Sequence, residues 1–482
     1  MNPIAPADES RLKPVPLVEL LRSLPAPWPT TELEEHIRQR ILASGCKVVA
    51  IDDDPTGCQT VHDVPLLLEW SIDALVEGLR DPAPAMFILT NTRAMHEIDA
   101  VALNHEVACN LRLASLRTGK PFVALSRSDS TLRGHYPAET DALDAELGPY
   151  DGIIIAPCFF EAGRHTVGGV HWVQMGEQLV PAAQTESARD PTFGFHHSYL
   201  PAWVEEKTSG RFTAEEVLVV DLEGLRRGGP AWVAERLAGV KDRRPVIVDA
   251  VDYGDLHIFV AGLLQAEEAG KRFLYRTAAS FLRVRAGITP RPLLTHAELL
   301  GKAGPARGLV GVGSFVPRST AQLRRLLECP AVTGIELPVQ RLLKGRGQVG
   351  VIAEMVEQIC QVYDAGQTPV VFTSRNLEVG KDAEDSLRIM NLVAKALVDV
   401  VREAVGRCRF DFVVGKGGIT AHQLAQQALG ARRTRVLGQI AAGVPVWRLG
   451  PESAMPGAPY VVFPGNVGDE MTLAQVVRLL AS

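Results

Sequence analysis

The stretch KVVAID, residues Lys47–Asp52, decides the fold class, because it is a short apolar run that leads directly into a polar turn. Short runs rich in β-branched residues predict buried strands. Helical patterns at Ile98–Thr118 and Pro137–Leu147 separate this run from others of its kind. Alternating strands and helices predict an α/β fold with a largely parallel sheet. The other runs are Ala85–Thr90, Phe122–Ser126, Gly152–Ala156, Val217–Asp221 and Pro245–Asp249.

A second set of strands and helices begins near residue 307. Between the sets, segment 287–306 carries three prolines and three glycines, which predicts a domain boundary. We therefore predict an N-terminal extension (1–44), a first domain (45–286), a linker (287–306) and a second domain (307–482). The strands of the second set are Gly308–Val312, Pro369–Thr373, Phe410–Val414 and Tyr460–Phe463. Its helices are Thr320–Glu328, Gln348–Ala365, Asp382–Val405 and Thr420–Ala428, and a last helix, Thr472–Leu480, could pack on either domain.

The composition excludes several classes of protein. The chain has 482 residues, 46% hydrophobic and 22% charged, with a net charge of −6, so its overall field does not favour nucleic acid. It has no apolar run of the roughly 18–20 residues that span a bilayer, and its first residues lack the pattern of a signal peptide. Seven cysteines without a CxxC pair predict reduced thiols rather than a disulfide framework or zinc site. We expect a cytoplasmic protein without nucleic acid or membrane partners.

The turn after the first strand reads Asp53–Asp54–Pro55–Thr56–Gly57. In open α/β sheets ligands bind at the carboxyl ends of strands. Together with Asp52, this turn places three carboxylates side by side, and they repel one another unless a cation or a substrate hydroxyl balances them. A solvated acidic turn is the alternative, but the position at a strand end favours a functional site.

A second polar segment, Ser126–His135 (SRSDSTLRGH), also follows a predicted strand. Arginine matches carboxylate or phosphate oxygens with its planar fork, and hydroxyls together with a carboxylate suit a polyhydroxylated ligand. A third segment, Glu161–His171, could place Arg164 and His165 over a ligand. The spacing of its histidines matches no standard zinc pattern, so we expect no protein-held metal site. The residues around it, 157–212, are predicted to form an ordered loop.

In the second half, the predicted strand Phe410–Val414 runs into a Gly-rich turn and a helix start, with Thr420 as the expected N-cap. Such a turn is an anion cradle, because backbone N–H groups and the positive end of the helix dipole face the ligand. A similar turn follows Gly308–Val312, and Ser319–Gln322 resembles a capping box. We expect the cradle to bind nucleotide phosphates through Ser314, Gly417, Gly418, Ile419, Thr420 and Gly465.

Three of these motifs together resemble the four-carbon acid sugar kinase family, over roughly residues 45 to 475: Asp53–Gly57, Asp129–Gly134 and Gly417–Thr420. The second, Asp-Ser-Thr-Leu-Arg-Gly, is the most specific. The resemblance implies a first domain that binds the acid sugar, a second domain that binds ATP, and an active site in the interdomain cleft. It implies phosphorylation, with ATP and Mg²⁺, of the terminal hydroxyl of an acid such as threonate, erythronate or 3-oxo-tetronate. A homodimer is a candidate assembly.

The chain departs from the family pattern in two turns. Many members carry an acid after the Gly-Gly pair, where this chain has Ile419, and many read Lys-Ser-Gly where it has Phe463–Pro464–Gly465. Because the Gly-rich turn then lacks a carboxylate, we predict Asp53 as the catalytic base or orienting group, with Asp129 as the runner-up. We expect Arg133 or Arg164 to hold the substrate carboxylate. The other expected substrate contacts are Asp54, Thr56, Arg127, Ser130, Thr131 and His165.

Two other functions fit parts of the sequence. The pattern Asp52-x-Asp54-x-Thr56, with Thr90–Asn91 after the next strand, fits a phosphatase of the haloacid dehalogenase type, in which an aspartate is phosphorylated. That interpretation leaves residues 300–482 without a role. The altered turns at Ile419 and Gly465 also fit a non-catalytic acid-sugar binding protein.

Overall fold

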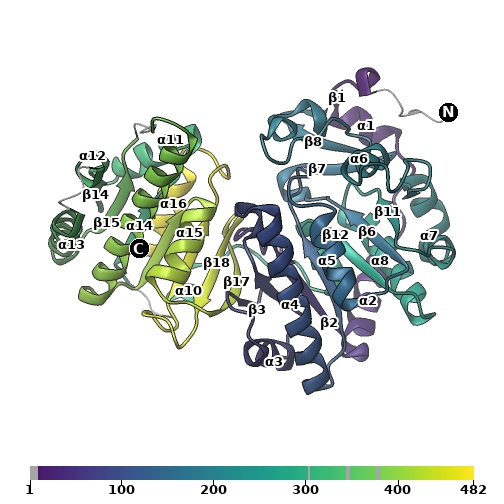
Figure 1. The fold of residues 1–482 in the computed structure, drawn as a ribbon, viewed down its shortest axis with the longest axis horizontal. Coiled ribbons are helices and arrows are strands. Elements are labelled where there is room, and N and C mark those ends of the chain that lie inside the picture. Colours follow the sequence, from purple (N-terminus) through teal and green to yellow (C-terminus); the bar gives the residue numbers. More distant parts are fainter. Residues whose placement is uncertain (1–8, 302–303, 344–347, 376–379) are drawn as a thin grey trace. The chain divides into compact units, whose positions relative to one another are not determined.

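The structure is a computed structural model that describes residues 9–301, 304–343, 348–375 and 380–482. The chain divides into two compact units (Figure 1). Unit 1 contains residues up to Thr60 together with Glu69–Pro290. Unit 2 contains Val61–Leu68 and Arg291–Ser482. The short segment 61–68 belongs to unit 2 because its strand β3 (Val64–Leu67) pairs with β17 (Arg433–Ala441).

The main sheet of unit 1 is entirely parallel within the described residues, in the order β10-β11-β6-β12-β5-β2-β4. Its central strands are buried at every residue because helices cover both faces, which is the usual environment of parallel sheets. The strands are β2 (Lys47–Asp52), β4 (Ala85–Leu89), β5 (Phe122–Arg127), β6 (Gly152–Ala156), β10 (Leu218–Val220), β11 (Arg244–Val248) and β12 (Phe273–Thr277). The predicted strands agree to within one residue at each end, whereas β12 was not predicted.

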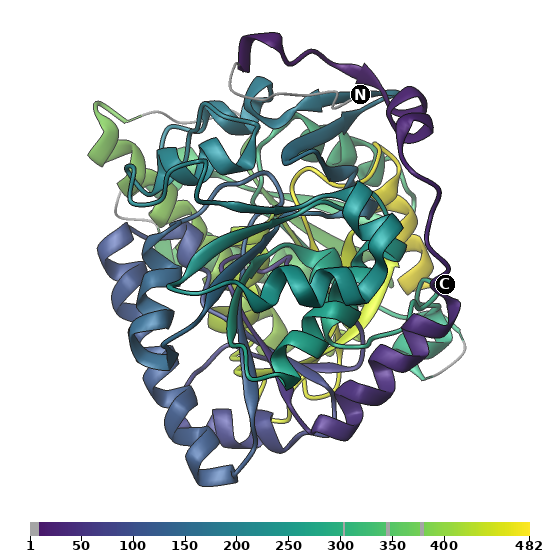
Figure 2. The same ribbon diagram turned by 90° about the vertical axis from the view of Figure 1, so that its right-hand side faces the viewer.

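The helices of unit 1 form two packed groups. Helices α3 and α5 each contact α4, and helices α2 and α7 each contact α8. In Figure 2 the blue helix α4 and the purple helix α2 lie on opposite sides of the unit. The bounds are α1 (Leu17–Ser23), α2 (Thr31–Ser44), α3 (Ile72–Arg80), α4 (Glu97–Thr118), α5 (Ala138–Leu147), α6 (Leu200–Lys207), α7 (Leu222–Ala238), α8 (Tyr253–Glu268) and α9 (Ala279–Arg285).

Segment 157–212 was expected to be an ordered loop, but part of it forms regular structure. Strands β9, β8 and β7 form a small antiparallel sheet with β1, in the order β1-β9-β8-β7, and α6 follows. The tight hairpin turn at Gly168–Gly169, with both φ angles positive, is the glycine pair that favours such hairpins. The buried carboxylate of Asp249 accepts hydrogen bonds from both of these amides, at 2.6 and 2.9 Å. The strands are β1 (Val15–Pro16), β7 (Arg164–Val167), β8 (Val170–Met175) and β9 (Gln178–Pro181).

Unit 2 has a mixed sheet in the order β3-β17-β18-β19-β16-β13-β15-β14. The strands from β19 to β14 are parallel, whereas β3, β17, β18 and β19 pair antiparallel. Helix α16 packs against α10 and α11, so it belongs to this unit. The other strands are β13 (Gly308–Val312), β14 (Val332–Leu337), β15 (Thr368–Thr373), β16 (Phe412–Lys416), β18 (Val444–Leu449) and β19 (Pro459–Phe463). The helices are α10 (His296–Leu300), α11 (Pro317–Leu327), α12 (Val339–Leu343), α13 (Gln348–Asp364), α14 (Ala383–Arg407), α15 (Gly418–Gln423) and α16 (Thr472–Ala481).

Three predicted boundaries in unit 2 are wrong. Strand β16 begins and ends two residues later than predicted, so Lys416 is its last residue. Helix α15 begins at Gly418 with Gly417 as its N-cap, and Thr420 lies inside the helix instead of capping it. Helix α11 begins at Pro317, a favoured residue of the first helical turn, so the expected capping box at Ser319–Gln322 does not form. A π-helical turn, Leu424–Ala428, follows α15.

None of the described helices has the length and apolar character needed to cross a bilayer.

Candidate functional site

The candidate site of unit 1 lies where the parallel strands β2, β4, β5 and β12 end. Asp52 pairs in register with Leu89 of β4 and with Arg127 of β5, and Arg127 pairs with Thr277 of β12. The polar segments after these strands therefore leave the sheet at one edge, the edge at which open α/β sheets bind ligands.

Arg93, which follows β4, joins the two acidic motifs. Its Nε donates to Asp53 Oδ2 at 3.1 Å and its Nη1 to Asp54 Oδ2 at 3.0 Å, while Asp129 Oδ1 is 4.0 Å away. Burial disfavours the charge on Arg93, but these carboxylates outweigh it and raise its pKa. Burial likewise opposes the charge on Asp54, and Arg93 and Arg127 still lower the pKa of that carboxyl. The cation that the acidic turn requires is thus Arg93, which the sequence analysis did not single out.

Asp52 is enclosed beneath the acidic turn. Its side chain is 1% exposed, and its Oδ2 has no hydrogen-bond partner among the described residues. Burial raises the pKa of Asp52 to about 7, although Arg127 opposes the rise. Gly57 lies directly over the carboxyl group, where any Cβ would overlap it. An enclosed carboxyl group cannot attack a phosphate ester, which argues against Asp52 as the nucleophile of a phosphatase.

The second polar segment folds around Asp129. Arg133 Nε donates to Asp129 Oδ2 at 2.7 Å, and its Nη1 is 3.7 Å from Asp190. The Thr131 hydroxyl also donates to Asp129. Burial raises the pKa of Asp129, but the positive charges of Arg93 and Arg133 hold it well below its usual range. The backbone carbonyl of Ser130 is bonded to His171 Nε2 at 2.7 Å, which fixes the segment against β8. Arg133 is therefore already paired within the protein.

Arg164, at the start of β7, differs from Arg133 in having a free guanidinium group. Its side chain makes no hydrogen bond or ion pair within the described part of the chain, and its buried Nε lacks a partner. Burial lowers the pKa of Arg164; the charge of Asp129 opposes this effect and that of Arg133 adds to it. The adjacent His165 is occupied, because its Nδ1 is bonded to the Val251 carbonyl at 3.0 Å. Of the two arginines expected to hold a substrate carboxylate, only Arg164 is unpaired.

The remaining expected residues of unit 1 support the cluster. The Thr56 hydroxyl and backbone amide both donate to Asp54. Arg127 lies 3.4 Å from Asp52 and 3.7 Å from Asp53, so it neutralises the base of the acidic turn.

Two further charged residues at this edge were not found from the sequence. Arg276, in the middle of the FLYRT run of β12, is 2% exposed and lies over the rings of Tyr136 and Trp203 at 4.9 and 5.1 Å. Glu139, in α5, accepts the Thr92 hydroxyl, and burial together with the charge of Asp53 raises its pKa to about 7. For Arg276 the available signal was a charged residue inside an otherwise apolar strand, whereas Glu139 lies in a helix with three further acidic residues and gave no such signal.

The candidate site of unit 2 lies where β13, β16 and β19 end. Val312, Lys416 and Phe463 are paired in register, so the turns after them meet. A Cβ on Gly417 would lie 2.9 Å from Ser314 Cβ, and a Cβ on Gly465 3.5 Å from Ser314 Oγ. Thr420 packs against Gly313, and the Ser319 hydroxyl bridges Ser314 Oγ and the Gly465 carbonyl at 3.0 and 3.1 Å. The expected residues therefore meet, with Gly418 and the exposed Ile419 in the first turn of α15.

Two cationic side chains donate hydrogen bonds to backbone carbonyls at these turns. Lys416 is fully buried, and its Nζ donates to the carbonyls of Pro464 and Gly465 at 2.5 and 3.1 Å. Arg375 donates to the carbonyls of Ser314 and Thr373, both at 2.7 Å. Lys416 falls within the predicted Gly-rich turn but was not named as a site residue, and Arg375, which follows β15, belongs to no predicted motif.

No group of three or more His, Cys, Asp or Glu side chains in the described ranges is arranged to hold a metal ion. Mg²⁺ usually keeps several waters and binds one or two carboxylates together with substrate phosphates. The donor set of unit 2 is poor in carboxylates but includes the hydroxyls of Ser314 and Thr420. These donors fit a Mg²⁺ ion that is bound mainly by nucleotide phosphates.

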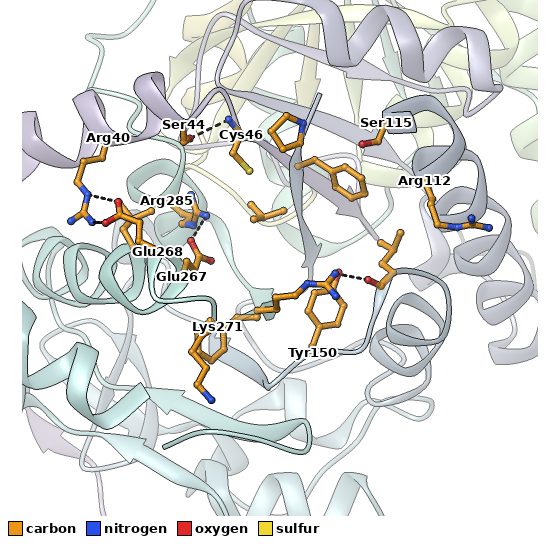
Figure 3. A pocket seen from close by; sticks show the side chains of 17 residues that line it. Arg40, Ser44, Cys46, Arg112, Ser115, Tyr150, Glu267, Glu268, Lys271 and Arg285 are labelled. Atoms are coloured by element: carbon orange, nitrogen blue, oxygen red, sulfur yellow. Dashed lines mark hydrogen bonds and ion pairs between the residues drawn. The ribbon is translucent and has the colours of Figure 1, made fainter. Parts of the chain in front are cut away.

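A cavity of about 550 Å³ lies elsewhere in unit 1, against the first residues of β5 and β12 (Figure 3). It is at the opposite edge of the sheet from the acidic turn. Its charged groups are largely paired with the protein itself: Arg40 with Glu268, Arg285 with Glu267, and Arg272 with the Leu147 carbonyl. This cavity is therefore separate from the candidate site.

Comparison with known proteins places both sites in one family. Two family models match the chain: a sugar-binding N-terminal domain over residues 48–285 and a nucleotide-binding C-terminal domain over residues 309–473. The D-threonate kinase of Bordetella bronchiseptica is 27% identical over 89% of this chain and 96% of that protein. The chain belongs to the four-carbon acid sugar kinase family. The resemblance seen in the sequence is thereby confirmed, and so is the enzyme class, a phosphotransferase with an alcohol group as acceptor.

Two other family comparisons are consistent with this assignment. The D-erythronate kinase of Heliobacterium modesticaldum is 29% identical, and its match spans 58% of this chain and 59% of that protein. A solved structure of a Haemophilus influenzae protein has a TM-score of 0.62 at 16% identity, covering 90% of this chain and all of that one. This likeness confirms the two-domain α/β fold.

Proposed function

We propose that this chain is an ATP-dependent kinase that phosphorylates the terminal hydroxyl of a four-carbon acid sugar of the threonate, erythronate or 3-oxo-tetronate type. The observation that carries the proposal is the free guanidinium group of Arg164 beside an otherwise paired acidic cluster. An acid substrate supplies the carboxylate that this arginine lacks, and the hydroxyls of the substrate suit the neighbouring carboxylates.

In unit 1, Arg164 holds the substrate carboxylate and Asp53 orients the acceptor hydroxyl. Arg93 donates hydrogen bonds from Nε and Nη2 to the two carboxylate oxygens of Asp53, which fixes the carboxylate in one orientation. Phosphoryl transfer depends mostly on positioning and on electrostatic stabilisation, so a fixed carboxylate suits the acceptor. Asp129 remains the second candidate for this role. Arg133 acts indirectly, because it is bound to Asp129.

In unit 2, the turns after β13, β16 and β19 bind the phosphates of ATP. Gly417 has a φ of +106° and no side chain, so the Gly-rich turn can approach a ligand closely. The first amides of α15 and the hydroxyls of Ser314 and Thr420 complete the cradle. Mg²⁺ bound to the phosphates would neutralise their charge.

A coupled assay of ADP release tests this function directly. Purified protein is supplied with ATP, Mg²⁺ and one compound from a panel of threonates, erythronates and 3-oxo acids, with the neutral alcohols threitol and erythritol as controls. We expect ADP release with at least one acid and none with the neutral alcohols. Hydrolysis of simple phosphate esters without ATP would support the phosphatase instead, and tight acid binding without turnover would support a binding protein.

A further inference from the structure

Lys416 occupies an unusual place for a lysine. It is the last residue of β16 and fully buried, and it pairs in register with Phe463, the last residue of β19. Its Nζ donates to the carbonyls of Pro464 and Gly465 and lies 4.4 Å from the centre of the Phe463 ring. No carboxylate among the described residues forms an ion pair with it. A buried ammonium group is strongly disfavoured unless an anion compensates its charge.

The missing anion is what a phosphate would supply. Lys416 directly precedes Gly417, and its bonded turn, Pro464–Gly465, lies against Ser314. An ammonium group has three N–H donors, and the two protein carbonyls use two of them. Burial, with a smaller effect from the positive charge of Arg318, lowers the pKa of Lys416 to about 7. Two carbonyls and the Phe463 ring stabilise this amine, and a bound anion would add the opposite charge that the described residues do not supply.

The register also relates Lys416 to the altered turn at Phe463. Position 463 holds a buried aromatic ring, and Lys416 stands at the paired position of the neighbouring strand. Both residues directly precede turns of the candidate nucleotide site, so a lysine at either position would put one positive charge at this level of the sheet.

We propose that Lys416 is a positioning residue of the nucleotide site, which holds the Pro464–Gly465 turn and sets one positive charge beside the nucleotide phosphates. This inference deepens the proposed function and rests on it. It predicts that the lysine can be moved between the two strands without loss of nucleotide binding.

The test uses the full chain and the non-hydrolysable analogue AMP-PNP, with affinity measured by calorimetry. Lys416→Met keeps the length of the side chain and removes the charge. We expect affinity to fall about ten- to hundredfold, the range for loss of a hydrogen bond to a charged group. Lys416→Arg should lose less, and the double variant Lys416→Met/Phe463→Lys should regain most of the affinity.

Rescue separates a role at the nucleotide from general support of the fold. Thermal unfolding of each variant is measured in parallel. We expect KM for the acid to be unchanged in every variant, whereas KM for ATP should rise in Lys416→Met and fall again in the double variant, which restores the positive charge. Nucleotide affinity of Lys416→Met equal to that of wild type would overturn the inference. Should Lys416→Met fail to fold, Lys416→Arg and the double variant decide, and a folded double variant that still binds weakly would also overturn it. A wild-type chain that binds no nucleotide would instead reject the proposed function.

Discussion

Each of the two units places polar groups at the carboxyl edge of its sheet, but the chemical groups differ. The edge of unit 1 is built from charged side chains, with Arg93 bonded to Asp53 and Asp54. The edge of unit 2 is built from glycine turns, hydroxyls and one buried lysine. Side chains suit a small substrate whose carboxylate and hydroxyls must be distinguished. Backbone amides suit phosphates, whose oxygens are equivalent acceptors.

The two edges also differ in which charged side chains lack a partner among the described residues. In unit 1 most charges neutralise one another, and Arg164 and Arg276 each keep a buried nitrogen without a hydrogen-bond partner among the described residues. In unit 2 no carboxylate among the described residues pairs with Lys416, whose Nζ is bonded to the carbonyls of the turn itself. The predictions below test whether side chains carry binding in one unit and the backbone carries it in the other.

The largest effect is expected at Asp53. Asp53→Asn keeps the shape and removes the charge that orients the acceptor, so kcat should fall by about 10²–10⁴-fold while substrate affinity is largely kept. Asp73→Asn, at an exposed ion pair with Arg117, is the control and should leave kcat unchanged. Single-turnover kinetics measure the step. A chemical step within threefold of wild type would move the role to Asp129.

Arg164 should matter more than Arg133 for recognition of the acid. Arg164→Gln removes the proposed partner of the substrate carboxylate. It should lower kcat/KM by a factor that corresponds to a loss of about 2–5 kcal/mol of binding free energy, the range for loss of a buried charged contact. Arg133→Gln should have a smaller effect, because Arg133 is already bonded to Asp129. The measurement is kcat/KM for the best acid. The reverse order of the two variants would show that Arg133 is the anchor.

In unit 2 a single methyl group should weaken nucleotide binding. Gly417→Ala places a Cβ 2.9 Å from that of Ser314 at a φ of +106°, and crowding of this kind costs about 1–3 kcal/mol. We expect the affinity for AMP-PNP to fall about tenfold. Gly430→Ala is the matched control, since it has a positive φ of +65° and open space around its Cβ. Equal losses in both variants would attribute the effect to backbone strain alone.

The smallest effect is expected in the dependence of stability on pH. The pKa of Asp52 is raised to about 7, so between about pH 4 and 7 the folded protein keeps a proton that the unfolded chain has lost. The contribution of this group to the unfolding free energy therefore decreases as pH rises through that window. Asp52→Asn should flatten the decrease, as measured by calorimetric unfolding of unit 1 at several pH values. An unchanged slope would mean that Asp52 titrates normally.

Lys416 should act with the opposite sign in unit 2. Burial lowers its pKa to about 7, so between about pH 7 and 10 the unfolded chain binds a proton that the folded protein has released. Its contribution to the unfolding free energy therefore increases with pH in that window. Lys416→Met should remove the increase from the unfolding of unit 2. Identical pH profiles of this variant and wild type would contradict the shift.

The sequence predicted the positions of the polar segments along the chain better than the side-chain contacts between them. Strand ends could be located because buried parallel strands are continuous apolar runs, and this placed Asp53, Asp129 and Gly417 correctly at sheet edges. Arg93 and Arg276 were missed, because their partners depend on which strands are neighbours, and a single sequence does not contain the strand order. Strand β12 was missed for a local reason, because Arg276 interrupts its short apolar run.

The hairpins were also missed, for a local reason. The β7–β8 turn, Gly168–Gly169, was assigned to an irregular loop although paired glycines favour tight hairpins. Lys416 was placed in a turn because strand β16 ends two residues later than its apolar run suggests. Its position beside Phe463 follows from the register of β16 and β19.

One binding experiment tests the division of labour between the units most directly. Calorimetry would measure a four-carbon acid and AMP-PNP, each alone, against wild type, Arg164→Gln and Gly417→Ala. We predict that Arg164→Gln weakens binding of the acid and leaves AMP-PNP unaffected, whereas Gly417→Ala weakens AMP-PNP and leaves the acid unaffected. Loss of nucleotide binding in folded Arg164→Gln, or of acid binding in folded Gly417→Ala, would contradict the account.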